Sequence, residues 1–91
     1  MLVRHKVKDF PKWKKVFDEH TAFREENGSK GGYLFRNIDN SDETIIIFKW
    51  NYLEDARQFA SSENLKDIME RAGVADKPDI YFLNEVEKVS A

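Results

Sequence analysis

The chain has 91 residues, enough for one domain, and its 41% hydrophobic and 35% charged content is typical of a folded globular protein. Fifteen basic against seventeen acidic side chains give a formal net charge of -2, which argues against a nucleic-acid-binding protein. The lack of cysteine excludes disulfides and thiolate metal sites, and no apolar run is long enough to cross a membrane. We therefore expect one cytoplasmic domain over residues 1–91, with neither nucleic-acid nor membrane partners.

The first half of the chain predicts a strand, a helix and a hairpin. Side chains on alternate sides of Leu2–Val7 follow the period of a strand. Asp9 is placed to cap an amphipathic helix that ends near Gly28. Strands are predicted over Tyr33–Ile38 and Thr44–Trp50, joined by a polar turn.

The second half predicts a broken helix and a final strand. Asn51 is placed to begin a helix, with Glu54 completing a capping box, and Ser61 with Ser62 breaks or bends it. A further helical segment ends at Gly73, and Asp79–Val89 is the last strand. The resulting order, β-α-β-β-α-β, indicates an α+β ferredoxin-like fold with helices on one face of a four-stranded antiparallel sheet. Right-handed crossovers give the strand order 4-1-3-2.

The two faces of the predicted sheet are both apolar in part. The face assigned to the helices carries Val3, His5, Val7, Tyr33, Phe35, Ile46, Phe48, Trp50, Ile80, Phe82 and Val86. The opposite face carries Leu2, Leu34, Ile38, Ile45, Ile47, Tyr81 and Leu83, together with Arg4, Lys6, Arg36, Lys49, Glu85 and Glu87. Monomers rarely expose such a patch, so we predict a homodimer in which two sheets face each other, with Arg4 and Lys6 paired to Glu85 and Glu87. The alternative is a monomer with a half-apolar exposed face.

Both histidines are candidate catalytic residues. His5 by strand parity and His20 by helical spacing are expected in the space between sheet and helices, where a neutral imidazole is suited to act as a base. They are equally read as core histidines bonded to the backbone. No carboxylate or third histidine is spaced to complete a metal site, so we expect neither a metal nor a cofactor.

Several other side chains are candidates for a substrate pocket. Trp50, Tyr33 and Phe59 either line an aromatic-binding pocket or form part of the hydrophobic core. Asn84 falls on the same face by parity and needs a polar partner, which a neighbour, solvent or a ligand would supply.

Three segments carry a family resemblance: Phe10–His20, Trp50 and Glu54–Leu65. Together with the topology they resemble the dimeric α+β barrel superfamily, in particular its antibiotic-biosynthesis-monooxygenase type. The resemblance implies a homodimer with a pocket between sheet and helices in each subunit. That superfamily includes cofactor-independent oxygenases of polycyclic phenols, haem-degrading oxygenases, polyketide cyclases and proteins with no known reaction.

The haem-degrading branch fits this chain poorly. Its members carry a Trp in the second helix, a His ten residues later and an Asn on the first strand. The corresponding positions here hold Phe59, Met69 and His5. All three are replaced, which puts haem degradation of that type in doubt.

Three functions stay open from the sequence. The first is a cofactor-independent monooxygenase or cyclase acting on a small aromatic or polyketide-like compound, with His5 or His20 as base and Trp50 or Asn84 positioning oxygen or an enolate. The second is a non-catalytic ligand-binding dimer, and the third is a structural dimer with a filled core. A cavity of about 300 Å³ or more that touches a histidine would favour the first two.

Overall fold

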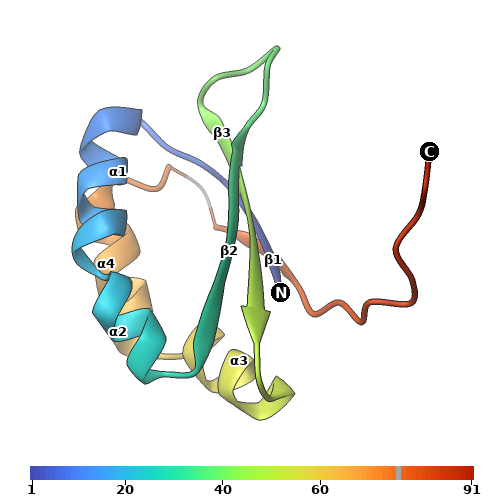
Figure 1. The fold of residues 1–91 in the computed structure, drawn as a ribbon. Coiled ribbons are helices and arrows are strands. Elements are labelled where there is room, and N and C mark those ends of the chain that lie inside the picture. Colours follow the sequence, from blue (N-terminus) through green and yellow to red (C-terminus); the bar gives the residue numbers. More distant parts are fainter. Residues whose placement is uncertain (76) are drawn as a thin grey trace.

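The computed structural model describes residues 1–75 and 77–91 as a single sheet with helices. Its elements are β1 (Leu2–Lys6), α1 (Phe10–Glu19), α2 (Thr21–Glu26), β2 (Ser29–Arg36), β3 (Glu43–Trp50), α3 (Leu53–Ala60), α4 (Glu63–Ala72) and β4 (Asp79–Tyr81). All strand pairs are antiparallel and the order across the sheet is β2-β3-β1-β4 (Figure 1). The α+β ferredoxin-like fold and the strand order predicted from the sequence are therefore confirmed.

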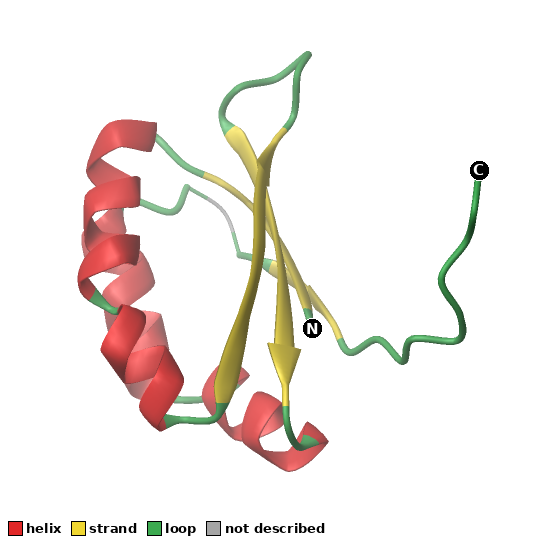
Figure 2. Cartoon of the chain, in the orientation of Figure 1, coloured by secondary structure: helices red, strands yellow, loops and turns green. Residues whose placement is uncertain are grey.

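The helices cover one face of the sheet. Figure 2 shows α1, α2 and α4 as a layer on one side of the strands, with α3 at the end where β3 finishes. The C-terminal residues lead away from the sheet on the other side and leave that face uncovered. None of the helices in the described part of the chain has the length and apolar content that crossing a membrane requires.

The predicted first helix is divided in two at His20. Asp9 caps α1 as expected, its carboxylate accepting the Lys12 amide N–H at 3.2 Å. At the junction, the His20 amide N–H donates to the Phe17 carbonyl. The Nδ1 of the His20 ring bonds to the Val16 carbonyl oxygen at 2.8 Å. The side chain thus takes the acceptor four residues back that the backbone would use in a continuous helix, and the helix breaks there.

The second helical region matches its predicted break but differs at its start. The expected bend at the paired serines is confirmed, because Ser62 caps α4 by accepting the Leu65 amide N–H at 3.1 Å. The predicted cap by Asn51 is wrong. The N-cap residue of α3 is Tyr52, and its side chain makes no capping hydrogen bond. The left-handed Gly73 ends α4 as predicted.

The face assignment of β2 is wrong by one residue. Leu34 lies opposite Ile46 and Tyr33 opposite Ile47, so Leu34 faces the helices and Tyr33 faces away. Phe35 likewise faces away, whereas Arg36 lies over the Phe10 ring of α1 at 4.0 Å. The turn at residues 38–42 and an irregularity between residues 29 and 32 set this register, and neither is encoded in the apolar pattern of the strand.

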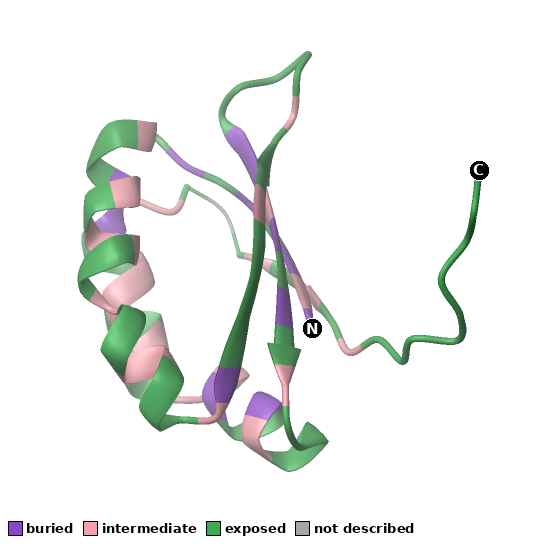
Figure 3. Cartoon of the chain, in the orientation of Figure 1, coloured by how far each residue is buried: buried purple, intermediate pink, exposed green. Residues whose placement is uncertain are grey.

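The last strand is much shorter than predicted. Only Asp79–Tyr81 pairs with β1, and Tyr81 already lies opposite Leu2, the first residue of β1. No β1 backbone therefore lies opposite Leu83 and the residues after it, which are exposed and run away from the sheet (Figures 1 and 3). The predicted pairing of Arg4 with Glu85 and Glu87 is also wrong, because Arg4 binds Glu43 at 2.8 Å and Asp79 at 3.0 Å.

The core lies between the sheet and the helix layer. Figure 3 shows the buried positions on the strands and on the helix surfaces that face them. One row of the sheet crosses all four strands beneath the helices and consists of Leu34, Ile46, Val3 and Ile80. Trp13, Phe48 and Phe59 pack above and beside this row and are at most 8% exposed.

Candidate functional site

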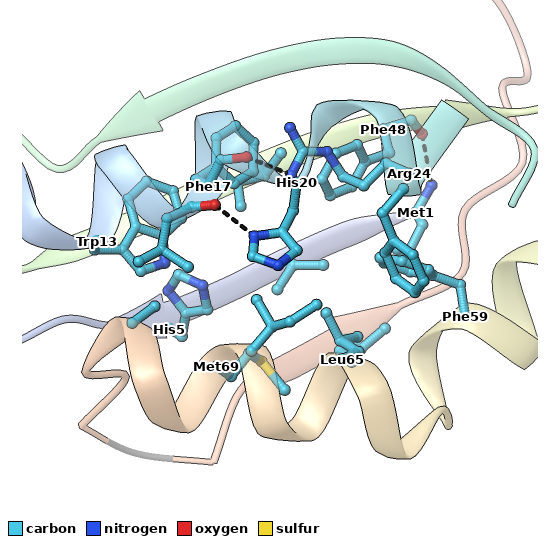
Figure 4. Close-up of a pocket in the computed structure, with 17 residues that line it drawn as sticks. Met1, His5, Trp13, Phe17, His20, Arg24, Phe48, Phe59, Leu65 and Met69 are labelled. Carbon is cyan, nitrogen blue, oxygen red and sulfur yellow. Dashed lines mark hydrogen bonds between the residues drawn. The ribbon is translucent and has the colours of Figure 1, made fainter. Parts of the chain in front are cut away.

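A small apolar cavity lies between the sheet and helices α1, α2 and α4 (Figure 4). Its volume is about 60 Å³, and its walls include Trp13, Phe48, Phe59 and Met69. Both histidines border it: His5 from β1 and His20 from the α1–α2 junction. Strand parity and helical spacing therefore placed both candidate bases correctly beside one space.

His5 is buried and held in one orientation by Thr44 of β3. The Thr44 hydroxyl donates to the His5 carbonyl at 3.2 Å, so it accepts the His5 Nδ1–H at 2.6 Å. This assignment satisfies both contacts and leaves Nε2 unprotonated. Burial lowers the pKa of His5, which favours the neutral ring, and the edge of the ring packs against Trp13 at 5.5 Å.

His20 also has a defined tautomer. A carbonyl oxygen only accepts, so the 2.8 Å contact between the His20 ring and the Val16 carbonyl requires a proton on Nδ1. In the neutral ring, Nε2 then carries the free lone pair. Figure 4 shows the ring projecting from the helix junction toward Leu65 and Met69 of α4. His20 thus presents a basic nitrogen at the cavity wall.

Arg24 of α2 is a further wall residue that the sequence reasoning missed. Its Nη1 donates to the Phe17 carbonyl at 2.8 Å and its Nη2 donates to the Thr21 hydroxyl at 3.2 Å. The guanidinium lies 3.8 Å from the centre of the Phe17 ring (Figure 4). The signal was the spacing of Trp13, Phe17, His20 and Arg24 along one helical face, on which an arginine is out of place unless it is used.

The other predicted pocket residues divide between different surfaces. Phe59 borders the cavity as expected. Trp50 and Asn84 instead border a separate groove of about 500 Å³ beyond β3, and within the described residues the buried Nε1 of Trp50 has no hydrogen-bond partner. Tyr33 is 71% exposed and opposite Ile47, so it faces away from this cavity, for the register reason given above, and it borders an outer groove of about 490 Å³ between α2 and β2.

The charged groups give no metal-binding arrangement in the part of the chain that is described. Residues 1–75 and 77–91 contain no group of three or more histidine, aspartate or glutamate side chains close enough to hold an ion. The cavity offers two imidazoles, aromatic walls and one guanidinium. Such a set can accept a proton and stabilise an anion without a cofactor of its own.

The fold is shared with several solved structures. A protein from Bordetella bronchiseptica provisionally described as an antibiotic biosynthesis monooxygenase superposes with a TM-score of 0.78 at 13% identity, over 94% of each chain. A provisionally described antibiotic biosynthesis monooxygenase from Caulobacter crescentus gives 0.73 at 18% identity, over 94% of this chain and 87% of that one. A third, from Nitrosomonas europaea, gives 0.71 at 10% identity, over 98% and 90%.

These similarities show the fold of the single chain that the family resemblance implied. At such low identities they carry the fold and leave the reaction to be argued from the site. No family model and no curated protein matches the chain.

Proposed function

We propose that the chain works as a homodimer formed through the uncovered side of the sheet, called here the bare face. This face carries Leu2, Arg4, Lys6, Tyr33, Phe35, Ile45, Ile47, Lys49 and Tyr81. An apolar row crosses it from edge to edge through Tyr33, Ile47, Leu2 and Tyr81. Such a continuous row is suited to pack against a symmetric copy.

Exposure of these side chains supports the dimer. Tyr33 is 71%, Tyr81 55% and Phe35 48% exposed in the single chain. Burying large apolar side chains of this kind contributes roughly 1.5–3 kcal/mol each. The correction to the β2 register strengthens the argument, because it moves two aromatic side chains onto the bare face.

Sedimentation equilibrium tests the dimer with a matched pair of variants. The protein should sediment at twice the 10.7 kDa chain mass at micromolar concentration. Tyr33→Lys adds a cation beside Lys49 and should yield monomers, while Tyr52→Lys at the equally exposed residue before α3 should stay dimeric. A monomeric unaltered protein would refute the proposal.

We further propose that the cavity is the active site of a cofactor-independent monooxygenase or cyclase that acts on a small aromatic or polyketide-like compound. The observation that carries this is the convergence of His5 and His20 on one apolar space, each ring held through its Nδ1 so that Nε2 is left without a hydrogen-bond partner among the described residues. His20 is the candidate base, because its protonated ring would keep its Nδ1–H bond to Val16. His5 and Phe59 would shape and orient the bound ring. The structural neighbours are provisionally described as antibiotic biosynthesis monooxygenases, which agrees with an oxygenase reaction.

The base would make the substrate electron-rich enough to react. Removal of a proton from an activated CH₂ group gives a carbanion whose charge spreads into the aromatic system. With one O₂, such a CH₂ group becomes C=O and the second oxygen atom leaves as water. In a cyclase the same carbanion would attack a carbonyl of its own chain. The basic nitrogen of His20 suits both reactions.

The small volume of the cavity favours a second candidate function. About 60 Å³ is far below the roughly 300–1,000 Å³ of typical small-molecule sites. A substrate would need the cavity to widen into neighbouring space, whereas a structural dimer with a filled core would not. The non-catalytic dimer therefore stays the alternative to be tested.

Oxygen consumption with anthrone separates the two functions. The monooxygenase should consume one O₂ for each anthraquinone formed, and His20→Gln should lower the rate about 100-fold or more, the range expected for loss of a general base. His5→Gln should act more weakly, and Lys12→Gln on the outer surface of α1 should have no effect. Failure to oxidise anthrone, together with failure to cyclise polyketide-like substrates, would support the structural dimer.

A further inference from the structure

Arg24 is an unusual cation for a domain of this size. Its guanidinium carbon lies over Phe17, 3.8 Å from the ring centre, and 5.9 Å from the centre of Phe48. The side chain is half-buried, and burial lowers the pKa of Arg24 below its ordinary value. Asp18 and Glu25 act in the opposite direction, but neither forms an ion pair with it.

The contrast with Arg4 shows what is missing. Arg4 is directed at two carboxylates, on Glu43 and Asp79. Arg24 has no carboxylate within ion-pair distance among residues 1–75 and 77–91, and its hydrogen bonds go to a carbonyl and a hydroxyl. A guanidinium has five N–H donors, so those two bonds leave donors free. A half-buried guanidinium with donors left over is suited to take an anion as a further partner.

Arg24 lies between two spaces from which an anion can reach it. Arg24 borders the apolar cavity on one side and an outer groove of about 490 Å³ between α2 and β2 on the other. Phe17, Ile46 and Phe48 are also shared by the two spaces. The groove carries a second cation, Lys30, and one acid, Glu25. A ligand could therefore place its ring against the shared aromatic wall and its charged group at the guanidinium.

We propose that Arg24 binds the anionic oxygen of the ligand, so that the site selects an aromatic compound that carries a phenolate, enolate or carboxylate over a neutral one. The proposal rests on the proposed function in taking the cavity as the ligand site, and it specifies the ligand class. It also gives His20 a partner: the nitrogen that removes the proton lies four residues before the cation that stabilises the resulting charge, and both border one cavity. The outer groove lies on the other side of the same wall, so the ligand would need a displacement of that wall to use both spaces.

The pair para-nitrophenol and para-nitroanisole tests this selection directly. The two probes share the nitroaromatic ring, but only the phenol ionises, and its absorbance reports the phenolate fraction. At the pH where the free phenol is half ionised, the protein should raise the phenolate fraction and bind the phenolate about tenfold more tightly than the anisole. Arg24→Gln should abolish both effects and retain anisole binding. Arg24→Lys keeps the charge and should retain part of the preference.

A matched control and a measurement on the unaltered protein complete the test. Arg57→Gln removes another guanidinium that covers an aromatic ring, Phe82, but borders neither space, and should change nothing. The Nε–H resonance of Arg24 in the unaltered protein should shift with the phenolate and not with the anisole. Equal binding of both probes would overturn the role of Arg24 and leave the cavity standing. Binding of neither would overturn the cavity as a ligand site and this proposal with it.

Discussion

The two faces of the sheet are made by the same strands, yet only one is covered. Under the helices the central row is Leu34, Ile46, Val3 and Ile80; on the bare face the adjacent row is Tyr33, Ile47, Leu2 and Tyr81. Both rows are apolar, so hydrophobicity does not distinguish them. They differ in what packs on them, and the candidate site exists only where helices close a space over the sheet. The comparison teaches that an apolar face identifies a contact surface before it identifies a pocket.

The largest effect should come from disturbing the register that separates the faces. A Cβ on Gly32 would lie 1.7 Å from the Ile47 carbonyl oxygen, at the point where β2 meets β3. Gly32→Ala should therefore cost about 3 kcal/mol or more in the free energy of unfolding, because backbone must move to admit it. Urea unfolding measures the loss.

Gly31 supplies the control for this prediction. It has a φ of +86°, but a Cβ there would meet nothing within 4 Å. Gly31→Ala should cost only about 1–2 kcal/mol, the strain of a left-handed alanine. Equal losses in the two variants would show that backbone conformation, and not the close approach of β3, makes Gly32 necessary.

Two phenylalanines on neighbouring strands compare the faces themselves. Phe48 is 8% exposed under the helices, and Phe35 is 48% exposed on the bare face. Phe48→Ala should cost about 3–5 kcal/mol at every protein concentration. Phe35→Ala should cost little in a monomer but should weaken the dimer, so it should lower the unfolding midpoint at concentrations where the unaltered protein is dimeric.

Thermal unfolding over a hundredfold range of concentration measures both effects. If Phe35→Ala lowers the midpoint as much at concentrations where the unaltered protein is monomeric, the bare face contributes through folding of the single chain and not through association. That result would favour the monomeric alternative for this face.

The sequence predicts the architecture well because the elements are locally encoded. Asp9, Ser62 and Gly73 sit at helix ends, and the apolar run in β3 marks a central strand. The face of β2 could not be predicted in the same way, because the tight contact at Gly32 and the turn set the register, and both depend on the partner strand. Aromatic Tyr33 and Phe35 look more core-like than Leu34, but the register decides which side they occupy.

The candidate site was predicted in part. Periodicity placed His5, His20 and Phe59 beside one cavity, but it could not show that the ring of His20 breaks its own helix. Trp50 and Asn84 were predicted to line the same pocket but border a separate groove, because the final strand stops pairing at Tyr81. Arg24 was overlooked because a charged residue on a helix is usually read as solvent-exposed.

Lowering the pH should reduce the free energy of unfolding, because His5 is buried under the helix-covered face. Its folded pKa is lower than the ordinary 6.5, so the unfolded chain binds the proton more readily. The stability that this difference gives is complete above the unfolded pKa and is lost as pH falls through the folded one. Each unit of difference corresponds to about 1.4 kcal/mol. His5→Gln should make the urea midpoint less dependent on pH between about pH 5 and 7.

This pH window also separates His5 from Glu43, whose pKa lies below its usual value. Parallel slopes in the unaltered protein and in His5→Gln would contradict the prediction, because they would assign the pH dependence to other groups. His20→Gln is the natural comparison, since it removes the second imidazole without touching Thr44.

The smallest effect concerns the charges of the bare face. Arg4 donates two bonds to Glu43, at 2.8 and 3.0 Å, and thereby holds the pKa of that carboxyl below its usual 4.5. Stability from this pair is present above the unfolded pKa and is lost as pH falls through the lowered folded pKa. Arg4→Gln should therefore raise the pKa of Glu43, as followed by carboxyl NMR titration. Lys14→Gln, which breaks an ion pair to Asp18 on α1, should leave it unchanged.

The direction of any residual shift is informative. Asn37 and Lys6 also lower the pKa of Glu43, but less than Arg4 does. A value that stays low in Arg4→Gln would transfer the main role to them and show that the bare face tolerates loss of its arginine. A rise that is larger in the dimer than in a Tyr33→Lys monomer would show that the partner sheet excludes water from the carboxylate, because desolvation penalises its charged form. The Arg4–Glu43 pair would then report directly on whether the second face of the sheet is covered.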